Sequence, residues 1–163
     1  MSLRVAIIIG SESDLKYANK CQETLKSLSI VSKIKVLSAH RTPVLLDNYI
    51  NKAEEEGVKI FIAMAGLAAH LAGSIAAKTI KPVIGVPLEA GPLNGFDSLL
   101  STVQMPRGIP VATVAVGNAG ASNSAYLAAQ ILGLESSDIT KTLKLIREQD
   151  SRTIMETNRG IKN

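Results

Sequence analysis

Short apolar runs alternate with longer amphipathic segments along most of this chain. The runs are rich in β-branched residues and occupy residues 4–9, 31–37, 58–63, 83–86 and 110–116. Such runs are typical of strands that are buried on both faces of a parallel sheet. Helical spacing separates them, with helices expected over residues 43–56 and 70–79 and from about residues 14, 97 and 118. The alternation predicts a three-layer, doubly wound α/β domain of the flavodoxin or Rossmann type.

A further helical segment follows this alternation at residues 137–158. It places Ile139, Leu143, Ile146 and Ile154 on roughly one face. This helix could pack on its own domain or on a neighbouring subunit, and we favour the second because the preceding units already complete a sheet. The chain has 163 residues, of which 46% are apolar, so residues 1–163 are expected to form one domain with a full core.

The composition excludes several kinds of site. Cys21 is the only cysteine, and the two histidines are not grouped with carboxylates, so neither a disulfide framework nor a metal site is expected. The net charge of +4 favours an anionic ligand, and aromatic residues make up only 3%, which disfavours stacking on nucleic acid. No apolar run is long enough to span a bilayer, so a cytoplasmic protein without membrane contact is expected.

Ligands of doubly wound folds bind at the carboxyl ends of the strands, so the loops there are the first candidates for a site. The loop after the first run reads GSESD, residues 10–14, and precedes a helix whose free amides favour an anion. Ser13 could equally be a simple helix cap and Ser11 a turn residue. The dinucleotide, Walker and nucleophile-elbow patterns are all absent from this loop.

The loop after the second run reads SAHRTP, residues 38–43. Arg41 can bind phosphate through its planar fork, and the imidazole of His40 can both donate and accept a proton, so one loop could hold an anion and move a proton. Thr42 is expected to cap the helix that begins at Pro43. After the third run, AMAGLAAHLAG supplies small residues that allow close approach of a ligand, and His70 is expected to support the site more than to react itself.

These motifs together resemble one enzyme family. GSESD, SAHRTP, AGLAAHLAG, GVPL, LNGFDSLLSTVQMPRGIPVATVAVG and GASNSAYLAAQIL, which extend to about Leu132, closely resemble the class I PurE family, the N5-carboxyaminoimidazole ribonucleotide mutases of purine biosynthesis. The resemblance implies a carboxyl transfer from the exocyclic amine to ring carbon 4, with no ATP, biotin, metal or other cofactor. It also implies a homo-octamer whose sites include residues of neighbouring subunits.

The same resemblance suggests a role for each matching residue. His40 matches the family's general acid and base. The carboxylate, ribose hydroxyls and phosphate of the substrate would be held by Ser11, Ser13, Asp14, Ser38 and Arg41. Ala65 and Gly66 would border the migrating carboxyl group, and His70 would support the pocket.

Three positions depart from the family pattern. Leu67 replaces the second of two paired glycines, Ala72 replaces a proline, and Glu89 stands where small or uncharged residues are usual. If position 67 requires a positive φ, Leu67 must be strained or its loop must take another path. Two alternatives stay open: a class II enzyme that carboxylates aminoimidazole ribonucleotide directly, and a catalytically silent nucleotide-binding protein. Arg41 and His70 favour the mutase.

Overall fold

A computed structural model describes residues 3–161, and within them five strands form one parallel sheet in the order β2-β1-β3-β4-β5. The strands are β1 (Val5–Ile9), β2 (Ser32–Val36), β3 (Ile60–Ala65), β4 (Val83–Pro87) and β5 (Ala112–Thr113). This order is that of flavodoxin-like proteins, in which the chain reverses its direction of travel between β1 and β3. The predicted fold class is confirmed.

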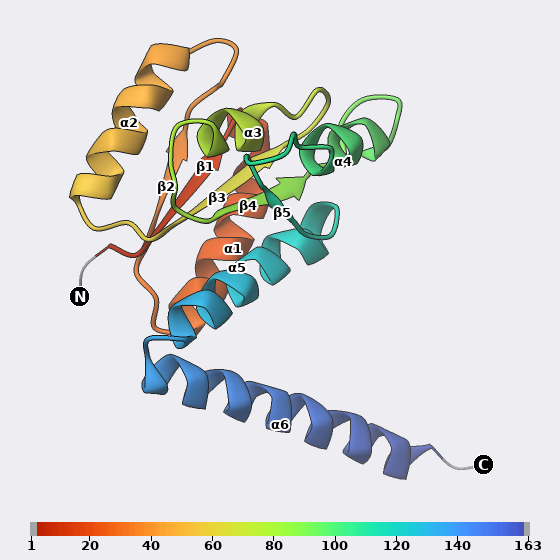
Figure 1. Ribbon diagram of the computed structural model, residues 1–163. Helices are drawn as coiled ribbons and strands as arrows, with labels where there is room; N and C mark the ends of the chain where they lie inside the picture. The colour runs from red at the N-terminus through yellow and green to blue at the C-terminus, as the bar shows by residue number, and fades with distance from the viewer. Residues whose placement is uncertain (1–2, 162–163) are drawn as a thin grey trace.

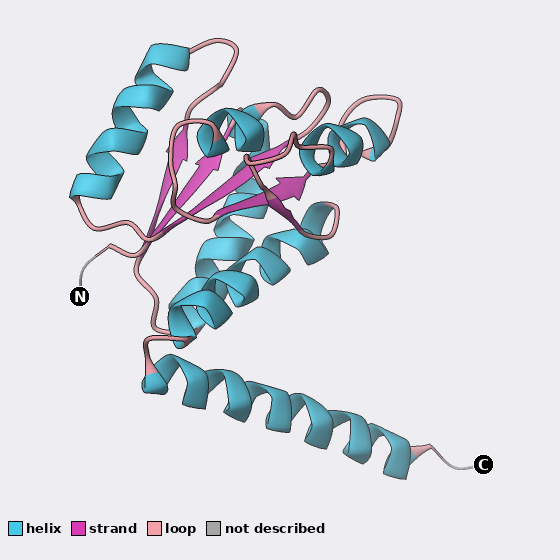
Figure 2. Ribbon diagram, in the orientation of Figure 1, coloured by secondary structure: helices cyan, strands magenta, loops and turns pink. Residues whose placement is uncertain are grey.

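Helices cover both faces of the sheet (Figures 1 and 2). The described helices are η1 (Glu12–Asp14), α1 (Leu15–Ser27), α2 (Pro43–Glu55), α3 (Leu71–Ala76), α4 (Phe96–Val103), α5 (Gly117–Gly133) and α6 (Ser137–Gly160). One core cluster joins α1 and α5 to one face of the sheet, and the other joins α2 and α3 to the opposite face. No described helix is both long and apolar enough to cross a membrane.

Strand β1 is apolar at every position because both of its faces are buried. Val5, Ile7 and Ile9 enter the core under α1 and α5, while Ala6 and Ile8 enter the core under α2 and α3. Successive side chains of a strand point to opposite faces, so a strand covered on both sides needs apolar residues throughout.

Some boundaries differ from the sequence-based expectation. Strand β5 has only two residues and pairs with β4 alone. Helix α3 ends at Ala76, since the chain turns there to reach Pro82 and the start of β4. Thr42 is the N-cap residue of α2, as expected, but its side chain makes no capping bond. Its Oγ1 instead accepts from the Ser38 amide at 2.9 Å and donates to the Ser38 carbonyl at 3.0 Å, which closes the loop.

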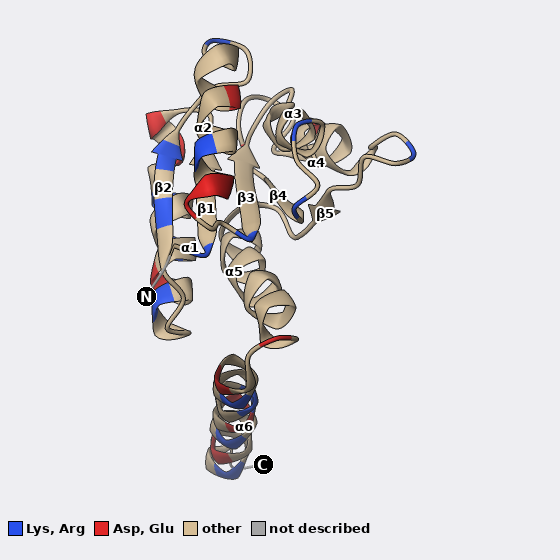
Figure 3. Cartoon of the chain, turned by 60° about the vertical axis from the view of Figure 1, so that its left-hand side comes forward, with Lys and Arg blue, Asp and Glu red and all other residues tan. Residues whose placement is uncertain are grey.

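Helix α6 extends away from the body of the domain (Figure 1). Its first half packs Ile139, Leu143 and Ile146 against the core, whereas Ile154 on the same face is 64% exposed. Charges of both signs lie along this helix (Figure 3) and form only exposed pairs such as Arg152 with Glu148 at 3.6 Å. Exposed pairs of this kind contribute little stability, so the outer half of α6 is held mainly by its own helical hydrogen bonds.

The start of α5 gives a test of this packing. A Cβ at Gly120 would overlap the carbonyl oxygen of Ala115, which is backbone and cannot rotate away. We expect Gly120→Ala to lower the free energy of unfolding by about 3 kcal/mol, measured by urea denaturation. Gly160→Ala is the control, because a Cβ there meets nothing within 4 Å. Equal stability of the two variants would contradict this account.

Candidate active site

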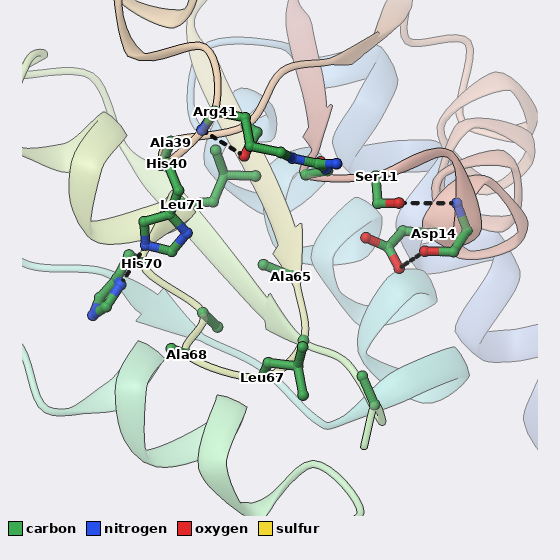
Figure 4. A pocket seen from close by; sticks show the side chains of 16 residues that line it. Ser11, Asp14, Ala39, His40, Arg41, Ala65, Leu67, Ala68, His70 and Leu71 are labelled. Atoms are coloured by element: carbon green, nitrogen blue, oxygen red, sulfur yellow. Dashed lines mark hydrogen bonds between the residues drawn. The ribbon is translucent and has the colours of Figure 1, made fainter.

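A pocket of about 500 Å³ lies at the carboxyl ends of the strands (Figure 4). The loops after β1, β2, β3 and β4 all contribute to it. Every site residue expected from the sequence lines this one pocket: Ser11, Ser13, Asp14, Ser38, His40, Arg41, Ala65, Gly66 and His70. A larger cavity of about 710 Å³ lies near the opposite ends of β4 and β5, but neither a histidine nor a carboxylate lines it. The chemistry of the lining therefore favours the first pocket.

The loop after β1 places hydroxyls and a carboxylate on one side of the pocket. Ser11, not Ser13, is the capping residue here, and its Oγ accepts from the Ser13 amide at 3.4 Å. The Ser13 hydroxyl donates to Asp14 Oδ1 at 3.2 Å. Burial raises the pKa of the Asp14 carboxyl, although hydrogen bonds from Ser13 and the Ser11 backbone, and the charge of Lys16, oppose this. Such a group is suited to accept hydrogen bonds from a sugar.

Arg41 joins the loop after β2 to the end of β1. Its Nη2 donates to the carbonyl of Gly10 at 2.7 Å, and its amide donates to Ser38 Oγ at 3.2 Å. A guanidinium carries five N–H donors, so one bond to Gly10 leaves donors for an anionic ligand. The positive charge is thus fixed beside the pocket before any ligand binds.

The two histidines of the chain form a direct pair. His40 Nε2 and His70 Nδ1 are 2.7 Å apart, and the rings meet edge to face at a centroid distance of 4.9 Å (Figure 4). His70 occupies the capping position of α3, but its side chain makes no capping bond. Because the hydrogen bond uses one nitrogen of each ring, His40 keeps Nδ1 and His70 keeps Nε2 for other partners. The pair can therefore pass a proton between a ligand and a second ring.

The loop after β3 forms an apolar side of the pocket. Leu67 has a φ of +55°, so this position does adopt the left-handed conformation that a leucine rarely takes. Sequence reasoning singled out Leu67 as a departure but missed Ala90, which contributes to the same pocket from the loop after β4. Ala72 does not line the pocket and is buried in α3.

Glu89 does not line the pocket. It is exposed, and its Oε1 lies 3.7 Å from the position that a Cβ would occupy at Gly117, the first residue of α5. The amino end of a helix carries partial positive charge, which favours a carboxylate. Glu89 therefore need not repel an anion in the pocket. Residues 3–161 contain no group of three or more potential ligands, among His, Cys, Asp and Glu, that could hold a metal ion.

Comparison with known proteins identifies the class of enzyme to which this fold and site belong. A sequence profile described as AIR carboxylase matches residues 4–153, and the chain belongs to that family. An N5-carboxyaminoimidazole ribonucleotide mutase of Bacillus subtilis is 49% identical over 94% of this chain and 95% of its own length. The mutase of Pseudomonas aeruginosa is 48% identical over 96% of each chain.

Solved structures agree with this assignment. A crystal structure of PurE from Treponema denticola has a TM-score of 0.89 and 29% identity and covers 98% of each chain. A PurE2 variant from the same organism has a TM-score of 0.91 and 28% identity and covers 100% of each chain. The similarity therefore includes the whole described length, α6 among it.

The raised pKa of Asp14 predicts a gain of stability when its charge is removed. A carboxyl whose pKa is raised above 3.8 in the folded state is costly as a carboxylate, so Asp14→Asn should raise the melting temperature at neutral pH. The gain should disappear well below pH 3.8, where both side chains are neutral. Thermal unfolding at both pH values measures this. A lower melting temperature at neutral pH would show that the carboxylate is stabilising.

Proposed function

We propose that this protein is an N5-carboxyaminoimidazole ribonucleotide mutase of purine biosynthesis. It moves the carboxyl group of N5-carboxyaminoimidazole ribonucleotide to ring carbon 4 and gives 4-carboxy-5-aminoimidazole ribonucleotide. The relatives that carry this name support the assignment. The observation that carries it is the 2.7 Å contact between His40 and His70 at the edge of a pocket with one polar and one apolar side.

The polar side is suited to the ribonucleotide part of the substrate. Arg41 supplies a planar, permanently charged fork for the phosphate, and Ser38 lies in the same loop. Ser11, Ser13 and Asp14 offer hydroxyls and a carboxylate for the ribose and the substrate carboxylate. Together these groups hold the imidazole ring toward the two histidines.

The histidine pair supplies the proton transfers. His40 donates a proton to the exocyclic nitrogen as its bond to the carboxyl carbon breaks, and carbon dioxide forms. The electrons of the ring then form the new bond from carbon 4 to that carbon, and neutral His40 takes the hydrogen of carbon 4 as aromaticity returns. One proton is given and one is recovered, so the reaction is an isomerisation with no oxidant or reductant. His70 orients His40 and shares its proton.

The apolar side confines the neutral intermediate. Ala65 and Gly66 border the migrating group, and small residues of the same loop bring the backbone close. Carbon dioxide that stays beside carbon 4 reacts at a high effective concentration, whereas carbon dioxide that escapes is lost.

The decisive assay compares the unaltered protein with His40→Asn. Freshly made N5-carboxyaminoimidazole ribonucleotide is added without ATP, metal or bicarbonate, and the C4-carboxylated product is followed. We expect rapid conversion by the unaltered protein and a loss of about 10²–10⁴-fold in turnover for His40→Asn. Binding of the product, measured by calorimetry, should be largely preserved. Substantial turnover by His40→Asn would show that His40 is not the proton donor.

The same assay separates the direct carboxylase. Aminoimidazole ribonucleotide with dissolved carbon dioxide is offered as the second substrate. Product from this mixture, and none from the carbamate, would overturn the mutase assignment. Failure of both substrates would indicate a silent ribonucleotide-binding protein.

We also propose that the protein works in the cytoplasm as a homo-oligomer, the octamer implied by its family resemblance, and that α6 packs on a neighbouring subunit. The argument comes from the apolar face of α6. Ile139, Leu143 and Ile146 on this face pack against the protein's own core, whereas Ile154, further along the same face, is exposed. An exposed isoleucine on an extended helix is readily covered by a second copy of the chain.

This arrangement predicts a change of mass. Ile154→Lys should produce smaller species in light scattering, because it puts a charge into the proposed contact. Gln149→Lys is the control, since it adds the same charge at an exposed position on the other side of α6. Equal masses for the two variants would contradict a role of Ile154 in assembly.

A further inference from the structure

Two loops at the apolar side of the pocket fit together residue by residue. A Cβ at Gly66 would lie 2.6 Å from the Ala90 Cβ and 3.3 Å from the Leu88 carbonyl oxygen. In the next pair along the two loops, the glycine is in the loop after β4: a Cβ at Gly91 would lie 2.7 Å from Leu67 Cδ2. At Gly66 the neighbouring Cβ leaves no room for a side chain, whereas at Gly91 a side chain would have to displace the end of Leu67.

The position of Leu67 is costly for a leucine. Its φ is +55°, and its side chain is 53% exposed. A branched side chain rarely adopts a positive φ, and a half-exposed leucine recovers only part of the free energy of burial. Neither backbone preference nor core packing therefore explains this residue. What it does make is a contact with Gly91 and a part of the pocket lining.

The loop that Leu67 contacts has few other restraints. It is anchored at its start, where the Leu88 amide donates to the Ala65 carbonyl at 2.9 Å and the Ser98 hydroxyl donates to the Leu88 carbonyl at 2.8 Å. Beyond Ala90, it contains three left-handed residues, Gly91, Asn94 and Gly95, and most of its residues are exposed. A contact at Gly91 is well placed to fix this part of the loop.

We propose that Leu67 is a positioning residue for the carboxyl transfer. It packs the loop after β3 against the loop after β4, and so holds Gly66 and Ala90 together where they confine carbon dioxide. The closure lasts from the breaking of the bond to nitrogen until the bond to carbon 4 forms. This inference rests on the proposed mutase function. Leu67 itself neither binds the phosphate nor moves a proton.

The test measures how much of the carboxyl group is retained. The substrate carries a ¹³C-labelled carboxyl group, unlabelled carbon dioxide is present in excess, and the label in the C4-carboxylated product is measured by mass spectrometry. A sample without protein corrects for spontaneous loss. We expect the unaltered protein to retain most of the label and Leu67→Gly to lose about tenfold more of it, with little change in KM. Leu67→Met, which keeps a long apolar side chain, should restore retention.

A second series tests the contact itself. Gly91→Ala should also lose label, because its methyl group would displace the end of the Leu67 side chain from this contact. This further loss should be much smaller when Leu67→Gly is already present. Gly108→Ala is the control for backbone strain, since Gly108 has a φ of +93° and a Cβ there meets nothing within 4 Å. It should retain label like the unaltered protein.

The outcomes distinguish the two proposals. If the unaltered protein forms no product from the carbamate, the mutase function fails. If it forms product and Leu67→Gly retains as much label, the function stands and the role of Leu67 is wrong. Equal losses of label in Gly91→Ala and Gly108→Ala would likewise overturn the role of the Leu67–Gly91 contact, because backbone strain alone would then account for both losses.

Discussion

The parallel pairing of β1 with β2 on one side and β3 on the other is the constraint on which this pocket depends. Ile9 lies opposite Val36 of β2 and Met64 of β3, so the three strands end at the same level. The loops that follow them are therefore brought together at one edge, although 30 residues separate His40 from His70. The chain's change of direction between β1 and β3 opens the space into which these loops turn.

The loops divide the chemistry of the pocket between them. Those after β1 and β2 bring hydroxyls, a carboxylate and a guanidinium, while those after β3 and β4 bring alanines, glycine and leucine. The histidine pair joins the two halves, because His40 comes from the polar side and His70 from the apolar side. A reaction that needs an anion held, a proton moved and a neutral gas confined can use all three parts at once.

Much of this arrangement could be predicted from the sequence. The apolar runs and helical spacing located most elements, and the rule that ligands bind at the carboxyl edge selected the right loops. The contact of His40 with His70 could not be predicted, since it depends on the path of two irregular loops. The bond of Arg41 to Gly10 and the two-residue length of β5 likewise depend on tertiary packing. The individual roles of the site residues came from family resemblance, since spacing alone gives only proximity.

Two features of the pocket lower the stability of the protein, a desolvated carboxyl group and a strained leucine. Asp14 has a pKa raised by burial, and Leu67 has a left-handed backbone. Both lower the stability of the empty protein, and the well-packed faces of β1 offset that cost. A ligand that donates hydrogen bonds to Asp14 would offset the desolvation of that carboxylate, and one that covers Leu67 would bury exposed apolar surface and so compensate for the backbone strain. The pocket is therefore arranged so that its least stable features are those that a bound ribonucleotide can stabilise.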